Sequence, residues 1–90
     1  MTQVGFQAHV GEGVVSSTDD DISFAGSYVF PASDTESAKV ELAVWDDVST
    51  EIDVTLHEGE TFEIAGQTWR LDKIHSEGQR HWYADLTRIA

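Results

Sequence analysis

The chain has 90 residues and a formal net charge of −12, from 17 Asp and Glu against 5 Lys and Arg. A chain of this length supports one thin core, so we expect a single domain over residues 1–90. The charge repels phosphate, which argues against nucleic acid and anionic membranes as partners. The absence of cysteine excludes disulfides, thiolate metal ligands and a cysteine nucleophile.

We expect the protein to be cytoplasmic. Its first residues contain neither a basic stretch nor an apolar run, which argues against a classical signal peptide. The uninterrupted apolar runs are only a few residues long, too short for a transmembrane helix. A small domain without disulfides also favours a reducing compartment.

Apolar and polar residues alternate along most of the chain, as they do in half-buried β-strands. In chain order the alternating segments are 4–10, 22–30, 39–45, 51–56, 60–71 and 82–86, with a short apolar patch at 14–15. Residues 33–36 (Ser-Asp-Thr-Glu) fit a helical capping box, but a strand pattern follows so closely that one helical turn is the most they could form. Seven or eight short strands predict an all-β fold, a small antiparallel sandwich or partly open barrel.

Segment 60–71 predicts a hairpin with a tight turn at residues 65–66, where Gly66 supplies the positive φ that a two-residue turn needs. Apolar residues of 62–64 and 69–71 then share one face. Ile74 is out of phase with the second arm, which predicts a β-bulge near residues 72–73. A further turn is expected at residues 76–79.

The charges are divided unevenly along the chain. Residues 1–66 carry 14 acids and 1 base, whereas residues 67–90 carry 3 acids and 4 bases, which gives −13 and +1. An acidic surface favours a basic partner and speeds its encounter. The alternative is that the acidity only keeps a small β-protein soluble.

Two acidic runs are the most suggestive polar groups, and Trp45 stands directly before one of them. An aromatic ring surrounded by carboxylates is typical of a binding site for a basic protein, although Trp45 could instead belong to the core, the interpretation we slightly favour, as for Tyr83. Clustered carboxylates could also bind Ca²⁺, although neither run has the ligand spacing of an EF-hand. The candidate partner-binding residues are Trp45, Asp46, Asp47, Asp19, Asp20 and Asp21, and the five aspartates are also the candidate metal ligands.

The four histidines match no zinc-ligand spacing, and His9, His75 and His81 fall on the polar phase of their strands, so we expect surface histidines. No motif for a serine nucleophile, a dinucleotide or a phosphate-binding loop is present. An enzyme is the least favoured hypothesis, and a histidine ring nitrogen within about 3 Å of a serine or carboxylate oxygen in a concave pocket would revive it.

Residues 56–74 and 82–89, with their Gly-Glu-Thr-Phe, Trp-Arg-Leu-Asp and Leu-Thr-Arg-Ile segments, resemble a family of small uncharacterised actinobacterial proteins. The resemblance covers roughly the last 35 residues. It implies a cytosolic β-domain and no assigned activity.

Together these observations predict a non-enzymatic, cofactor-free interaction module of the immunity-protein, inhibitor or adaptor type. Its expected partner is a basic protein or a second copy of itself, in which case the basic C-terminal hairpin would meet an acidic face. The alternative is a Ca²⁺- or small-ligand-binding β-domain, and a small hydrolase is the third hypothesis.

Overall fold

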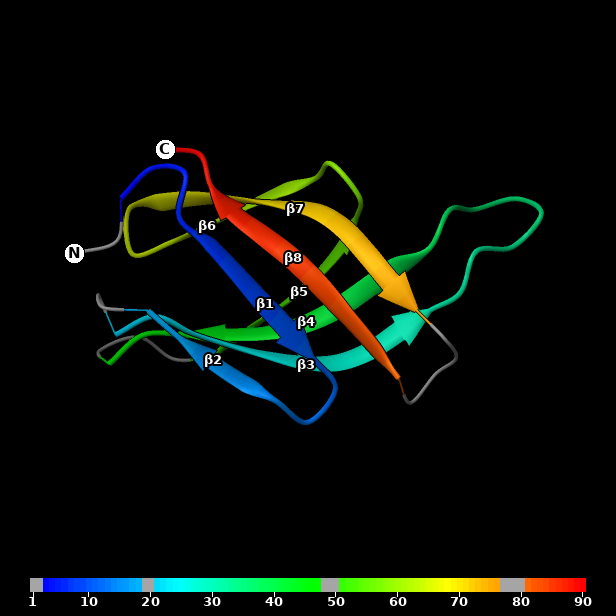
Figure 1. Cartoon of the computed structure of the whole chain (residues 1–90), viewed down its shortest axis with the longest axis horizontal. Coiled ribbons are helices and arrows are strands. Elements are labelled where there is room, and N and C mark those ends of the chain that lie inside the picture. The colour runs from blue at the N-terminus through cyan, green and yellow to red at the C-terminus, as the bar shows by residue number, and fades with distance from the viewer. Residues whose placement is uncertain (1–2, 19–20, 48–50, 77–80) are drawn as a thin grey trace.

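The computed structural model describes residues 3–18, 21–47, 51–76 and 81–90. Two four-stranded antiparallel sheets face each other and are not closed into a barrel, which confirms the predicted all-β sandwich (Figure 1). Sheet I has the strand order β1-β8-β7-β6 and sheet II the order β2-β3-β4-β5. The strands are β1 Gln7–Gly11, β2 Val15–Ser17, β3 Ser23–Phe30, β4 Lys39–Trp45, β5 Ile52–His57, β6 Thr61–Ile64, β7 Gln67–Ser76 and β8 Trp82–Arg88. The described part of the chain contains no helix that could cross a membrane.

The core lies between the two sheets and is built from the inward-facing phase of each strand. Its centre is aromatic: the rings of Phe24 and Trp69 meet edge to face with centroids 5.0 Å apart, and Phe62 packs on Phe24 at 6.1 Å. Trp69 and Phe24 are fully buried. Because successive side chains of a strand point to opposite faces of its sheet, the side chains between the core residues face the outside of the sandwich.

The hairpin of β6 and β7 forms as predicted. Ile64 pairs with Gln67, so the turn consists of Ala65 and Gly66, which have φ values of 52° and 76°. Two positive φ angles in a two-residue loop define a type I′ turn. The predicted bulge is also present, since the register between β7 and β8 shifts between Leu71 and Lys73.

One flank of the sandwich is closed where the chain passes from sheet I to sheet II. The link between β1 and β2 crosses β3 at Gly26, which forms a bridge with Glu12. A Cβ atom at Gly26 would lie 2.5 Å from the carbonyl oxygen of Gly11, so only glycine admits this crossing. On the opposite flank, the edge strands β5 and β6 belong to different sheets and are not paired with each other.

One local prediction is wrong. The first strand begins at Gln7 and not at Val4, which is 63% exposed, because residues 3–6 form a turn in which Phe6 donates to the carbonyl of Gln3 and Gly5 adopts a positive φ. Residues 33–36, for which one helical turn was the upper limit, contain a bend at 34–36, and the Ser33 amide donates forward to the Glu36 carbonyl at 2.8 Å. The turn expected at residues 76–79 falls mostly outside the described residues.

Candidate functional site

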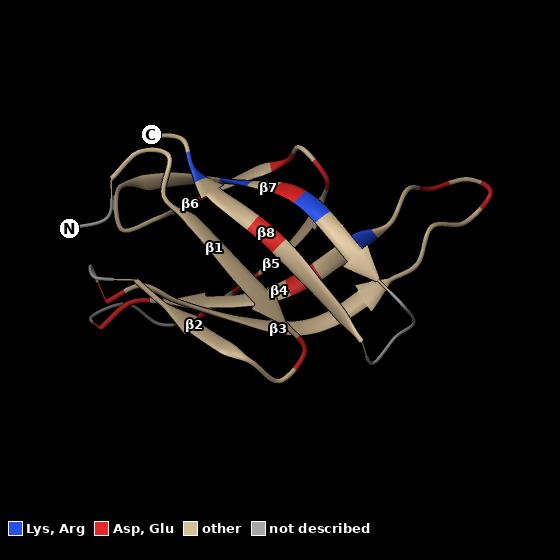
Figure 2. Ribbon diagram, in the orientation of Figure 1, with Lys and Arg blue, Asp and Glu red and all other residues tan. Residues whose placement is uncertain are grey.

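Several of the acidic residues singled out in the sequence meet at one end of sheet II. Asp21, Trp45, Asp46 and Asp47 line a hollow of about 230 Å³ together with two serines, Ser17 and Ser23, and we call it the acidic hollow. It forms because β3 begins and β4 ends at the same end of the sheet, with Ser23 paired to Trp45. Figure 2 shows acidic residues on both loops at this end.

The turn that precedes β3 positions Asp21. The Thr18 amide donates to the Ile22 carbonyl at 2.9 Å, the Ile22 amide donates to the Thr18 hydroxyl at 3.3 Å, and the Asp21 amide donates to the Thr18 carbonyl at 3.2 Å. Asp21 itself has a φ of 62°, a left-handed conformation that aspartate tolerates better than most residues. Asp21 therefore lies just before the β3–β4 ladder, where it lines the acidic hollow with the residues at the end of β4.

The slightly favoured assignment of Trp45 to the core is wrong, because this residue lies on the outer face of sheet II and is only half-buried. Asp46 is buried and interacts with another group of the chain, whereas Asp47 is exposed. Neither Asp21 nor Asp47 forms an ion pair with a described residue, so both carboxylates keep their charge available to solvent or a partner.

The structure gives the calcium hypothesis no support. Within the described ranges, no three His, Asp or Glu side chains are grouped so that they could hold a metal ion. Asp19 and Asp20 lie outside the described residues.

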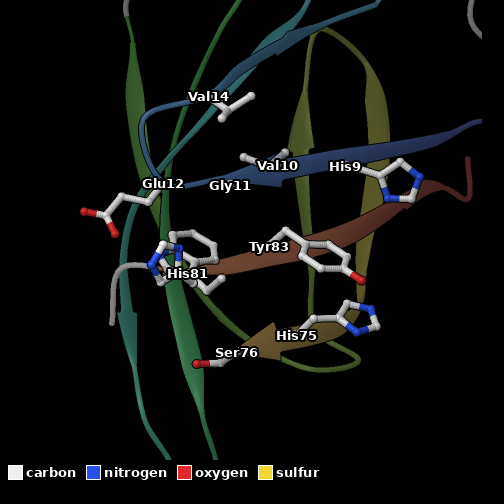
Figure 3. A pocket seen from close by; sticks show the side chains of 10 residues that line it. His9, Val10, Gly11, Glu12, Val14, His75, Ser76, His81 and Tyr83 are labelled. Carbon is white, nitrogen blue, oxygen red and sulfur yellow. The ribbon is translucent and has the colours of Figure 1, made fainter. Parts of the chain in front are cut away.

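A second and larger hollow lies on sheet I and was not anticipated. It measures about 820 Å³ and includes residues of β1, β7 and β8, as the labelled side chains of Figure 3 show; we call it the histidine hollow. Its lining residues are His9, Val10, Gly11, Glu12, Val14, His75, Ser76, His81, Trp82 and Tyr83.

At one side of the histidine hollow, a carboxylate joins two histidines across three strands. Asp85 accepts a hydrogen bond from His9 Nδ1 at 2.6 Å and another from His75 Nε2 at 2.9 Å. Because an ionised carboxylate only accepts, each imidazole donates with the stated nitrogen and keeps a lone pair on the other when neutral. The imidazole of His75 also stacks on the ring of Tyr83 with centroids 4.3 Å apart.

The electrostatics of this cluster favour the ionised form of Asp85. Burial acts to raise the pKa of its carboxyl, but the hydrogen bonds from His75 and His9 outweigh burial and hold that pKa below its ordinary value. An imidazole fixed by a carboxylate is an acid–base group, and these distances keep a small hydrolase open as the third hypothesis.

Strand register explains why the sequence did not reveal this cluster. His9 lies directly opposite Asp85 in the β1–β8 ladder, and the bulge after Leu71 aligns His75 with Tyr83. Alternation correctly predicted that His9 and His75 face outward, but it carried no information on which strands are neighbours. Tyr83, which we had slightly favoured as a core residue, is 48% exposed on the same face.

One buried polar group among these residues has no partner in the described part of the chain. The indole of Trp82 is buried, and its Nε1 forms no hydrogen bond with any residue that the structure describes. An unpaired buried N–H costs about 1–3 kcal/mol, so this indole is a locally unfavourable feature of the packing between the sheets.

The comparisons with known proteins add a family and no activity. A model described as a family of unknown function (DUF6406) matches residues 5–90, so the match extends across both halves of the chain and not only its last 35 residues. No curated protein and no solved structure matches the chain.

Proposed function

Since the chain belongs to the DUF6406 family of unknown function, its role must be inferred from its surfaces, and we propose that it is a non-enzymatic module that binds a basic protein partner at the acidic hollow. The observation that carries this proposal is the convergence of Asp21, from the turn before β3, with Trp45 and Asp47, from the end of β4 and just after it, around one concavity. An aromatic ring flanked by carboxylates suits a lysine or arginine side chain, which can lie over the ring while it donates to the acids.

The surrounding charge supports a basic partner. The outer face of sheet II also carries Glu41 and Asp53, and its one lysine, Lys39, is engaged by Glu36 at 2.7 Å. Uncompensated acids attract cations from a distance and exclude other acidic proteins. Self-assembly through the C-terminal hairpin is less favoured, because Arg70 is already paired with Asp72 at 2.6 Å.

The test uses an acetylated and amidated hexa-arginine peptide as the probe. Replacing both Asp21 and Asp47 by asparagine should weaken peptide binding about tenfold, the loss of one to two charge-assisted contacts. Titration followed by amide and indole NMR signals would measure the affinity and would place the peptide beside Trp45.

The matched control removes the same two charges elsewhere, as Asp34→Asn with Glu63→Asn, at exposed positions away from the hollow. If the control weakens binding as much as the double variant does, the peptide responds only to net charge and the proposed site is wrong. Affinity should also fall between 50 and 500 mM salt, because the contacts are ionic and partly exposed.

A second candidate function is small-ligand binding at the histidine hollow, and the size of the hollow together with the exposed ring of Tyr83 in its lining favours it. The volume falls within the range of about 300–1,000 Å³ typical of ligand sites. Glu12 contributes an acid and the described lining includes no Lys or Arg, so an anionic ligand is disfavoured. The exposed Tyr83, already stacked on one side by His75, offers an aromatic surface to an uncharged planar ring.

Adenosine and adenosine monophosphate form a matched pair of probes, since they differ only in the phosphate. We expect adenosine to move the Trp82 indole N–H and Tyr83 signals, and the monophosphate to move them several-fold less because the phosphate meets Glu12 and Asp85. Tyr83→Leu, which removes the exposed aromatic ring, should weaken adenosine binding. Equal responses to the two probes would contradict the charge argument.

A further inference from the structure

β5 is the outermost strand of sheet II, and its inner face is only partly covered. It pairs with β4, and no described strand pairs with its other edge (Figure 1). The inward-facing residues become more exposed toward its start: Leu56 is 5% exposed, Val54 is half-buried and Ile52 is 41% exposed. Two β-branched side chains are therefore left at the open flank of the sandwich.

The hydrogen bonds at the end of β5 show which backbone groups face the open flank. The amide of His57 donates to the Glu60 carboxylate at 2.6 Å, so it points away from β4. In an antiparallel strand, the residues whose backbone groups point toward the neighbouring strand alternate with residues whose groups point away from it. The N–H and C=O groups of Thr55 and Asp53 therefore also point away from β4, to the open side. The free edge therefore ends at His57, whose amide Glu60 already occupies.

The side chains along this edge have a consistent chemistry. The inner row is apolar, with Ile52 and Val54, and the outer row contains exposed Asp53, with Glu51 just before the strand. Asp53 forms no ion pair with any residue that the structure describes. An incoming strand would place its own inner residues beside the apolar row and its outer residues beside the acids.

We propose that β5 receives an extended segment of a basic protein as a fifth strand of sheet II. The segment alternates apolar residues, which cover Ile52 and Val54, with Lys or Arg residues, which face Asp53. Its pairing is short, about four residues, because only Asp53 and Thr55 present free backbone groups. This inference rests on the proposed function and adds the conformation and the residue pattern of the partner.

A second copy of the chain fits the edge less well than a basic segment does. Two β5 strands paired about Val54 would align Asp53 with Thr55, so the ladder itself is possible. The two chains would, however, combine net charges of −12 each without bringing a free cation to Asp53. Repulsion of this kind opposes close association.

The experiment uses two capped seven-residue peptides, Lys-Val-Lys-Val-Lys-Val-Lys and its counterpart with glutamate in place of lysine. Amide hydrogen exchange of the ¹⁵N-labelled full chain is measured with and without each peptide. The lysine peptide should slow exchange at Asp53 and Thr55, whereas the glutamate peptide should have no effect.

Variants separate the charge from the backbone. Asp53→Lys should weaken binding of the lysine peptide about tenfold, whereas Glu63→Lys, the same charge change on the exposed face of β6, should weaken it much less. Thr55→Pro removes one outward N–H without taking a bond from the β4 ladder, so it should abolish protection at Asp53 while the chain stays folded.

The possible results distinguish strand addition at β5 from binding at the acidic hollow. Protection at Asp53 and Thr55 that Asp53→Lys removes supports the inference. A lysine peptide that perturbs only Trp45 and Asp47 overturns the edge and leaves the proposed function standing, and a peptide that perturbs neither region overturns both. Protection that depends on protein concentration without peptide, with a dimer in sedimentation, shows that a second copy is the occupant and overturns the basic segment.

Discussion

Asp85 shows how one carboxylate can join three strands. It lies on β8, one of the two inner strands of sheet I, and accepts hydrogen bonds from His9 on β1 and His75 on β7. Its side chain remains partly exposed, so the contribution comes from charge-assisted hydrogen bonds at an interface with water and not from a buried ion pair. The residue therefore stabilises the register of sheet I without a large desolvation cost.

Asp85→Asn should reduce the free energy of unfolding by about 1–2 kcal/mol at pH 7, because asparagine is an uncharged and weaker acceptor for two imidazoles. The pKa of Asp85 is held below its ordinary value, so its contribution is fully present above that value and is lost as the pH falls through the folded-state pKa, below 3.8. Urea unfolding at pH 7 and near pH 3 measures this, and the gap between wild type and variant should be smaller at the lower pH.

Asp34→Asn is the control, since Asp34 is exposed and forms no ion pair with the described residues. It should leave stability within about 0.5 kcal/mol of wild type at both pH values. A gap for Asp85→Asn that stays constant between pH 7 and pH 3 would show that the carboxylate charge is not what stabilises the sheet.

Among the elements, β3 depends most on a single small residue. The link from β1 to β2 passes directly over Gly26, and the Gly13 amide donates to the Gly26 carbonyl at 3.4 Å. The end of the Trp82 ring also approaches the position where a Cβ would stand, at 2.7 Å. Backbone and indole therefore both occupy the space that a side chain at Gly26 would need.

Gly26→Ala should destabilise the protein by about 1–3 kcal/mol, because the nearest obstacle is the backbone of Gly11 and not the tip of a flexible side chain. Thermal or urea unfolding gives the measurement. The neighbouring Ser27→Ala, at the extra residue of the β3–β4 bulge, loses only a hydroxyl and should change stability little. Equal stability of Gly26→Ala and wild type would mean that the crossing strand can move aside at no cost.

At the scale of the whole molecule, the class of fold could be predicted from local patterns, but its topology could not. Alternation identifies which side chains of a strand face the core, and the Ala65-Gly66 turn specifies its own hairpin, because both are properties of neighbouring residues. The crossing at Gly26 and the pairing of β1 with β8 depend on contacts between distant residues that no local pattern contains.

The two hollows illustrate the same limit. Asp21, Trp45 and Asp47 each stood out in the sequence as an acid run or an aromatic beside one, yet their convergence depends on β3 beginning where β4 ends. The histidine hollow escaped the sequence altogether. Its carboxylate partner, Asp85, has no acidic neighbour in the chain and becomes distinctive only through the register of β1, β8 and β7.

The asymmetry of the two flanks bears on how the domain opens. The crossing at Gly26 ties β1, β2 and β3 together, whereas β5 is bonded through its ladder to β4 alone. Sub-global opening begins at strands with few neighbours, and on the open flank these are β5 and β6, each paired with one strand, so β5 can detach while the rest of the molecule stays native. A partner that binds β5 only while β5 is paired with β4 would increase the population of molecules in which this pairing is intact. Partner binding would then be thermodynamically linked to the stability of the fold itself.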